Sequence, residues 1–154
     1  MPVMTPPAPP TQAAVIQREQ VSRTQRLLSE RCIQGAAQHY QVRTDVLRAV
    51  MHQEAGTVGQ VRWNTDGSYD MGPMQINSKN LSMLAPYGIN AQNLTNNVCL
   101  NIYIGAWFLK SGILKRGDLW QGIGDYHSHT PSKNVAYQWR VYAQLQHLGQ
   151  QGEP

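Results

Sequence analysis

The sequence contains no long apolar run, no cluster of basic residues and few cysteines, and each absence narrows the class of protein. No stretch approaches the roughly 20 apolar residues of a membrane-spanning helix. The net charge of +4 would draw the chain to polyanions, which include nucleic acid, anionic lipid and the bacterial wall. Because its 13 Lys and Arg residues are scattered, we interpret them as a solvated surface. We therefore predict no nucleic-acid partner and no membrane span.

Cysteine occurs at two positions, Cys32 and Cys99, and neither lies in a C-x-x-C pair. This spacing matches no zinc or redox pattern. The two thiols could be buried and free. They could also form one disulfide, which would stabilise the domain by about 4 kcal/mol in the chain-entropy model. The spacing alone leaves both alternatives open.

The first residues lack the apolar segment of a secretion signal. We therefore expect either a trimmed mature form or export by another route. Residues 2–11 are rich in proline and are expected to be extended. Residues 12–28 are polar with scattered Val, Ile and Leu, and could form either a loose amphipathic helix or a disordered lead-in. We predict a flexible N-terminal segment over 1–28, one folded domain over 29–148 and a flexible tail over 149–154.

The rest of the chain shows apolar residues at helical spacing. The segment between Gln60 and Asn77 differs, because it is rich in turn residues and contains Asp66-Gly67, a hairpin signal. The predicted fold is mainly α with one hairpin or irregular segment. The predicted helices run from Ser29 to Tyr40, from Thr44 to about Gly56, over a few residues after Asn77, from about Thr95 to Leu114, from Trp120 to Tyr126, and from about Asn134 to Leu148.

Glu54 is the first candidate for chemistry. It lies near the end of the second predicted helix, on the same face as Leu47, Val50 and Met51. Partial burial and the negative end of the helix dipole would both raise the pKa of its carboxyl group. A carboxylic acid that stays protonated near neutral pH is what protonation of a glycosidic oxygen requires. The alternative is a solvated Glu that ends an amphipathic helix.

Several ordered motifs occur along the chain. They are Glu54-Ala55-Gly56, Asp66-Gly67-Ser68-Tyr69-Asp70, Gly72-Pro73-Met74-Gln75-Ile76-Asn77, Gly105-Ala106-Trp107, residues 124–131 and Tyr137. Together they resemble the lysozyme-like lytic transglycosylases, specifically the small single-domain group found with conjugation and with type III and type IV secretion systems. That group reads Glu-Ser-Gly, then Asn-Gly-Ser-x-Asp, then Gly-x-Met-Gln-Ile-Asn. The resemblance extends from about Glu30 to Val141.

This resemblance implies a lysozyme-like α fold with a sugar-binding cleft, a peptidoglycan substrate, and no metal or organic cofactor. It implies that Glu54 first protonates the oxygen that leaves N-acetylmuramic acid. As a base, Glu54 would then accept the proton of that sugar's 6-hydroxyl, which gives a 1,6-anhydro end. It also favours a Cys32–Cys99 disulfide and a periplasmic or exported protein. The substrate-binding residues implied by motif position are Ser68, Met74, Gln75, Asn77, Tyr126 and Tyr137.

Asp70 has two alternative roles. A second carboxylate near the acid is the arrangement of retaining glycosidases, where it acts as a nucleophile or stabilises the cation. Asp70 could instead bond the backbone of its own turn. Met74 is similarly open, between packing and sugar contact. His127 and His129 have no evident third ligand, so we predict no metal site.

Three residues depart from the family pattern, namely Ala55, Pro73 and His129, and the last two could reshape the cleft. We expect an enzyme that opens the wall locally for a secretion, conjugation or pilus apparatus. One rival is a muramidase that uses the same Glu54 but completes the reaction with water. The other is a non-catalytic component that binds the wall.

Overall fold

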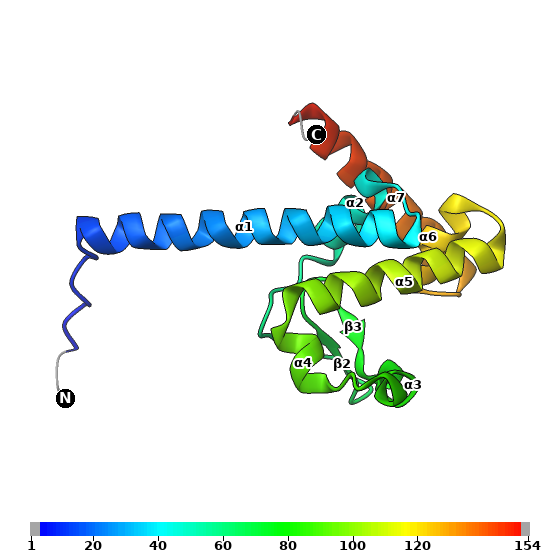
Figure 1. The fold of residues 1–154 in the computed structure, drawn as a ribbon, viewed down its shortest axis with the longest axis horizontal. Helices are drawn as coiled ribbons and strands as arrows, with labels where there is room; N and C mark the ends of the chain where they lie inside the picture. Colours follow the sequence, from blue (N-terminus) through cyan, green and yellow to red (C-terminus); the bar gives the residue numbers. More distant parts are fainter. Residues whose placement is uncertain (1–3, 152–154) are drawn as a thin grey trace.

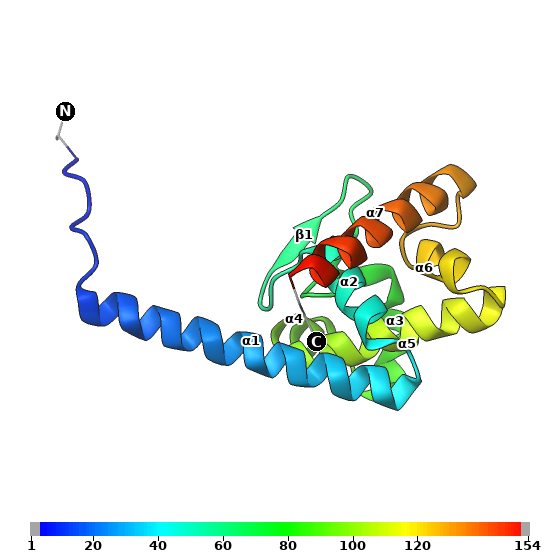
Figure 2. The same cartoon turned by 90° about the horizontal axis from the view of Figure 1, so that it is seen from above.

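The protein is described here by a computed structural model that covers residues 4–151. Within that range the chain forms seven α-helices, two short 3-10 helices and a small antiparallel sheet that lies to one side of the helices (Figures 1 and 2). This confirms the predicted mainly α fold. In chain order the elements are α1 (Gln12–Tyr40), α2 (Thr44–Glu54), β1 (Val61–Trp63), β2 (Tyr69–Met71), β3 (Ile76–Asn77), η1 (Ser78–Asn80), α3 (Leu81–Leu84), η2 (Ala85–Tyr87), α4 (Ala91–Asn96), α5 (Val98–Arg116), α6 (Leu119–His127) and α7 (Pro131–Gln150).

Helix α1 begins much earlier than the sequence pattern predicted. The Thr11 hydroxyl accepts a hydrogen bond from the Ala14 N–H, which caps a helix of 29 residues. The expected helix start at Ser29 was therefore wrong. Side chains before Ser29 are exposed, apart from the half-buried Ala14, and this half of the helix projects from the rest of the molecule (Figure 1). The proposed domain boundary after residue 28 coincides with the position where α1 starts to pack.

Helix α5 forms the centre of the core. The Asn97 side chain caps it by accepting from the Leu100 N–H, and Gly117 ends it in the left-handed conformation. The apolar residues Ile102, Ala106 and Leu109 are fully buried. A disulfide joins Cys32 of α1 to Cys99 of α5, which settles the two alternatives left open by their spacing. It closes a loop of 67 residues and so constrains the unfolded chain.

The middle segment contains a three-stranded sheet in the order β1-β2-β3. The predicted hairpin corresponds to β1 and β2, which pair antiparallel with Arg62 opposite Asp70. The third strand, β3, adds to β2 with Asp70 opposite Asn77. This register brings residues from three strands to one position beside Asp70.

Helix α7 completes the fold by packing against both α6 and α2. A hydrogen bond from the Gln144 amide to the Gln53 side chain, 3.3 Å long, links α7 to α2. Helix α7 includes residues 149 and 150, which were expected to belong to a flexible tail, while residues 152–154 of that tail lie outside the described range. None of the helices within residues 4–151 is both long and apolar enough to cross a membrane.

Candidate active site

Glu54 is the last residue of α2, and two features fix its backbone. Ala55 adopts a left-handed conformation with φ of 53°, so its N–H returns to the Met51 carbonyl and the helix stops. The Arg62 guanidinium donates to the Glu54 carbonyl at 3.1 Å and to the Ala55 carbonyl at 2.6 Å. Carbonyls at a helix end have no partner inside the helix, so Arg62 satisfies them from β1.

The Glu54 carboxyl group is largely enclosed, and burial raises its pKa above the ordinary value. The negative charge of Asp70 raises this pKa further. A hydrogen bond from the Tyr137 hydroxyl, 2.5 Å from Glu54 Oε2, acts in the opposite direction, as do the charges of Arg140 and Arg62. Burial outweighs these opposing effects, so the net shift of the Glu54 pKa is upward, which is the direction that a glycosidic proton donor requires.

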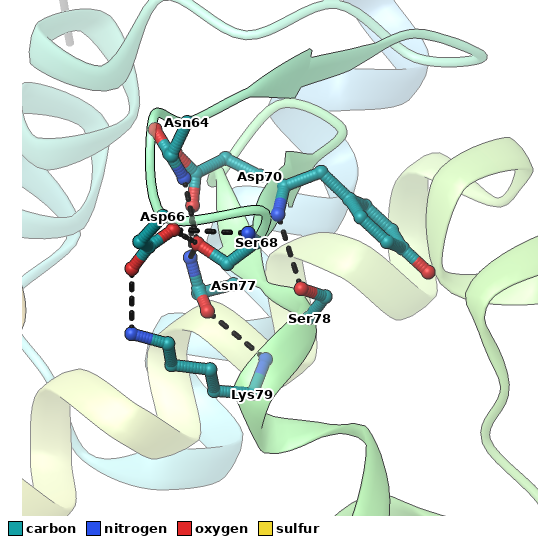
Figure 3. Close-up of polar contacts among 8 residues, drawn as sticks. Asn64, Asp66, Ser68, Asp70, Asn77, Ser78 and Lys79 are labelled. Atoms are coloured by element: carbon teal, nitrogen blue, oxygen red, sulfur yellow. Dashed lines mark hydrogen bonds and ion pairs between the residues drawn. The ribbon is translucent and has the colours of Figure 1, made fainter.

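Asp70 lies on β2 with its carboxylate held by two amides (Figure 3). Asn77 Nδ2 donates to Asp70 Oδ1 at 2.9 Å, and Asn64 Nδ2 donates to Asp70 Oδ2 at 3.1 Å. Each amide also donates to the Ser68 hydroxyl oxygen at 3.1 Å. Because both carboxylate oxygens accept side-chain bonds, the Asp70 side chain is held in one orientation beside Glu54.

The turn between β1 and β2 is fixed by Asp66. Its carboxylate accepts from the Ser68 N–H at 2.9 Å and from the Ser68 hydroxyl at 2.6 Å. Lys79 Nζ forms an ion pair with it at 2.7 Å, and this contact holds the pKa of Asp66 well below its usual range. Figure 3 shows how Asp66 ties the turn to the segment after β3. The turn thereby orients Ser68 and, through it, the two amides on Asp70.

The loop between β2 and β3 is anchored by Asn101 of α5, which is fully buried. Its amide donates to the carbonyls of Met71 and Leu94 at 2.9 and 3.0 Å. Its oxygen accepts from the Met74 N–H at 2.8 Å. Gly72 has φ of +66°, and a Cβ there would lie 2.4 Å from the Asn101 amide, so only glycine fits. Asn101 thereby ties the loop to α5 and to the end of α4.

A second close approach joins this loop to the end of α2. A Cβ on Gly56 would lie 1.9 Å from the Gly72 carbonyl oxygen. Only a glycine at position 56 therefore lets the segment after Glu54 pack against the loop. Gln75, with φ of 53°, follows in a conformation that side chains rarely adopt. Such strained residues often cluster at functional sites.

A cavity of about 550 Å³ opens in front of these groups. This volume falls within the range of ligand sites. Five of the residues predicted for the site line it, namely Glu54, Asp70, Gln75, Asn77 and Tyr126. Helix α5 supplies another wall, with Phe108, Ser111, Gly112 and Lys115 at helical spacing.

Three predicted substrate-binding residues lie behind the cavity. Ser68 orients the amides on Asp70, and Tyr137 donates to Glu54. Met74 is fully buried and packs closely on Gly105, where an added Cβ would lie 2.7 Å from the Met74 side chain. Of the two alternatives for Met74, this position supports packing and not contact with the sugar. The Tyr126 hydroxyl donates to the Met74 carbonyl at 2.6 Å, and burial raises the Tyr126 pKa well above its ordinary value.

The sequence reasoning missed Arg62 and Asn101. Arg62 could have been noticed as the only Lys or Arg between Arg48 and Lys79. Asn101 gave no signal, because one amide inside an apolar helix does not change the helical spacing.

The two candidate histidines, His127 at the end of α6 and His129 shortly after it, contact other side chains. The His127 ring stacks on Tyr137 with centroids 4.9 Å apart. His129 Nδ1 lies 3.1 Å from Asp125, whose carboxylate also accepts from Arg116 at 2.6 and 2.9 Å. Within the described residues no group of three His, Cys, Asp or Glu side chains is placed to hold a metal ion.

Comparison with known proteins agrees with this geometry. Residues 31–138 match the family described as the Transglycosylase SLT domain. The X polypeptide of Escherichia coli is 32% identical over 118 residues, which cover 72% of this chain and 70% of that protein. The Invasion protein IagB of Salmonella typhimurium is 31% identical over 103 residues, covering 66% of this chain and 64% of IagB.

Protein IpgF of Shigella flexneri is 29% identical over 103 residues, which cover 66% of this chain and 68% of IpgF. The matched family region contains α2, the sheet, α5 and α6 complete, and reaches Tyr137. The chain therefore belongs to the Transglycosylase SLT domain family, the lytic transglycosylases that act on peptidoglycan.

Proposed function

We propose that this lytic transglycosylase cleaves the β-1,4 bond between N-acetylmuramic acid and N-acetylglucosamine, with Glu54 as both acid and base. The observation that carries the proposal is the enclosed Glu54 carboxyl, whose pKa is raised by burial and which faces the cavity beside Asp70. In the first step protonated Glu54 gives its proton to the glycosidic oxygen, and the C1–O bond breaks. The cleaved bond leaves positive charge on C1 and the ring oxygen of the muramic acid residue.

Asp70 is proposed to stabilise that oxocarbenium-like state. Its carboxylate is held by Asn64 and Asn77, so it needs no rearrangement as the positive charge develops. In the second step the 6-hydroxyl oxygen of the same sugar attacks C1, while the Glu54 carboxylate accepts the hydroxyl proton. The product has a 1,6-anhydro end, and Glu54 is protonated again for the next cycle.

A muramidase is the second candidate, because a fixed second carboxylate beside the acid is also the arrangement of retaining glycosidases. In that reaction water would attack C1 and leave a reducing end. The rival without catalysis is disfavoured by the Glu54 site, because a component that only binds the wall has no need for an enclosed carboxyl group.

We further propose that the enzyme acts in the periplasm and opens the wall for a secretion or conjugation apparatus. Two observations support this role. This chain is similar to a protein named as an invasion protein, and the motifs of this chain resemble those of the secretion-associated group. Co-purification of a tagged chain with an apparatus from its host would test this role. Full assembly of every such apparatus in a strain that lacks the gene would contradict it.

The catalytic proposal is tested by incubating purified peptidoglycan sacculi with the protein and with Glu54→Gln. We expect release of soluble fragments to fall at least about a thousandfold in the variant, since no other group supplies the proton. Glu19→Gln makes the same chemical change on the exposed part of α1 and should retain full activity. Comparable release by the Glu54→Gln protein would overturn the assignment of Glu54.

A further inference from the structure

Helix α7 presents one side to the cleft and another side away from it. Tyr137 points to Glu54 in the cleft, whereas Tyr142, five residues later, lies about 140° further around the helix. Between Pro131 and Gln150 this helix carries Lys133, Arg140 and His147 but no Asp or Glu. Arg140 lies over the Tyr137 ring at 5.6 Å and belongs to the cleft side, whereas the side away from the cleft presents aromatic rings to solvent.

Three aromatic residues form a cluster on that side, which we call the α7 aromatic cluster: Trp120, Trp139 and Tyr142. The rings of Trp120 and Tyr142 have centroids 6.0 Å apart, and those of Trp139 and Tyr142 are 5.9 Å apart. Trp139 is 67% exposed and Tyr142 is 44% exposed. Single exposed rings are common, but aromatic rings that gather into one exposed patch often mark an interaction surface.

A groove of about 700 Å³ runs beside the cluster. It lies at the start of α2, whereas Glu54 ends that helix, so about 15 Å of helix separates the groove from the acid. In Figure 1 the end of α7 likewise points away from β2 and β3. The groove is lined by aromatic and apolar residues together with polar ones, including Trp120, Tyr142, Leu145, Arg43, Asp45 and Gln146.

The cluster also has unused hydrogen-bonding groups. In the described part of the chain, the indole N–H groups of Trp120 and Trp139 and the Tyr142 hydroxyl have no protein partner. A bound apolar peptide would cover these donors without pairing them, which costs free energy. A ligand with both a nonpolar face and hydroxyl groups would use the rings and the donors together.

We propose that this groove is a second, non-catalytic binding site for the glycan strand. A pyranose ring has one face of C–H bonds, which is attracted to the negative face of an aromatic ring. Its hydroxyl and acetamido groups pair with the indole, phenol and amide groups around the groove. The site holds the enzyme on the insoluble polymer while the cleft acts on another part of the wall.

This inference rests on the glycan substrate of the family but not on the role of Glu54. The first test labels the indole nitrogens of the Glu54→Gln protein and titrates it with peptide-free oligomers of N-acetylglucosamine. The four tryptophans give four indole signals. The signals of Trp120 and Trp139 should move along one binding curve. Movement of the Trp63 signal alone would overturn the proposal, because that residue lies on β1 beside the cleft.

The second test compares Glu54→Gln with Glu54→Gln/Trp139→Ala in binding to amidase-treated sacculi, which lack peptide stems. Loss of the exposed ring should weaken binding about tenfold, with the thermal midpoint unchanged. Tyr87→Ala is the matched control, since Tyr87 is 71% exposed and lies on η2, away from the groove. Equal binding by the Trp139 variant would overturn the proposal. A Trp139 signal that responds to poly-L-glutamate and not to glycan would also overturn it, since the groove would then fit an acidic protein.

Discussion

At the scale of single residues, the site depends on two carboxyl groups in different surroundings. Glu54 is enclosed and has a raised pKa despite its bond from Tyr137, whereas Asp70 accepts bonds from two amides. Burial disfavours the charged form of a carboxyl group, and fixed donors hold a carboxylate in one orientation. Neighbouring groups of the same chemical type can therefore serve as proton donor and as stabilising charge.

Tyr137→Phe should change the pH dependence of the reaction. The Tyr137 hydroxyl is the largest influence that lowers the Glu54 pKa, so its removal raises this pKa further. Glu54 must be protonated for the first step, and activity falls as the pH rises through its pKa. The alkaline limb of the rate profile should therefore move to higher pH, and the maximal rate should fall about tenfold as Glu54 loses its orienting contact. A limb that stays in place, as expected for the exposed control Tyr87→Phe, would contradict this account of Tyr137.

Asp70→Asn keeps the shape of the side chain and removes its charge. We expect the rate on sacculi to drop about a hundredfold, which is typical for loss of one stabilising group in a preorganised site. Asp118→Asn is a suitable control, because Asp118 caps α6 and Asn caps helices equally well. Nearly full activity of Asp70→Asn would assign Asp70 to the turn and not to catalysis.

At the scale of elements, the site is the meeting point of the end of α2, the sheet and the middle of α5. The end of α2 and the β1–β2 hairpin were predictable, because Gly56 and Asp66-Gly67 are strong local signals. Strand β3 was not, since Ile76 and Asn77 form a strand only by pairing with β2. The early start of α1 was missed for a related reason. Residues 12–28 have good helix formers but no continuous apolar face, so periodicity did not reveal the helix.

The contact between α5 and the β2–β3 loop can be tested with Asn101→Ala. This change leaves the Met74 N–H and the carbonyls of Met71 and Leu94 without their buried partner. The free energy of unfolding should fall by about 3 kcal/mol or more, and the thermal midpoint by roughly 6–12 °C. Circular dichroism melting would measure this. Asn96→Ala, at an exposed position of α4, should melt like the parent, and an equally small effect at Asn101 would contradict its anchoring role.

At the scale of the whole molecule, one folded domain carries a projecting helix. The disulfide between Cys32 and Cys99 and the ion pair between Arg48 and Glu30 tie the second half of α1 to the domain. The first half makes no comparable contact among the described residues, because its side chains before Ser29 are exposed, apart from half-buried Ala14. The sequence led us to predict a boundary after residue 28 from the burial-prone residues that follow Ser29, and it did not indicate that one helix extends across that position.

Deletion of residues 1–28 tests the proposed boundary. The shortened protein should melt within about 2 °C of the full chain and digest sacculi at a similar rate, since no core residue is lost. Deletion of residues 1–35 removes Glu30, Cys32 and Ile33 and should lower the midpoint by more than about 10 °C. If both deletions were equally damaging, the domain would begin before residue 29.

Mass spectrometry of the soluble fragments released from purified peptidoglycan tests most directly whether the protein carries out intramolecular transglycosylation through Glu54. We expect the parent protein, but not Glu54→Gln, to release muropeptides with 1,6-anhydro ends. Each of these is lighter by one water molecule than the corresponding hydrolysed fragment. Fragments with reducing ends that depend on Glu54 would contradict intramolecular transglycosylation and identify a muramidase that uses the same acid.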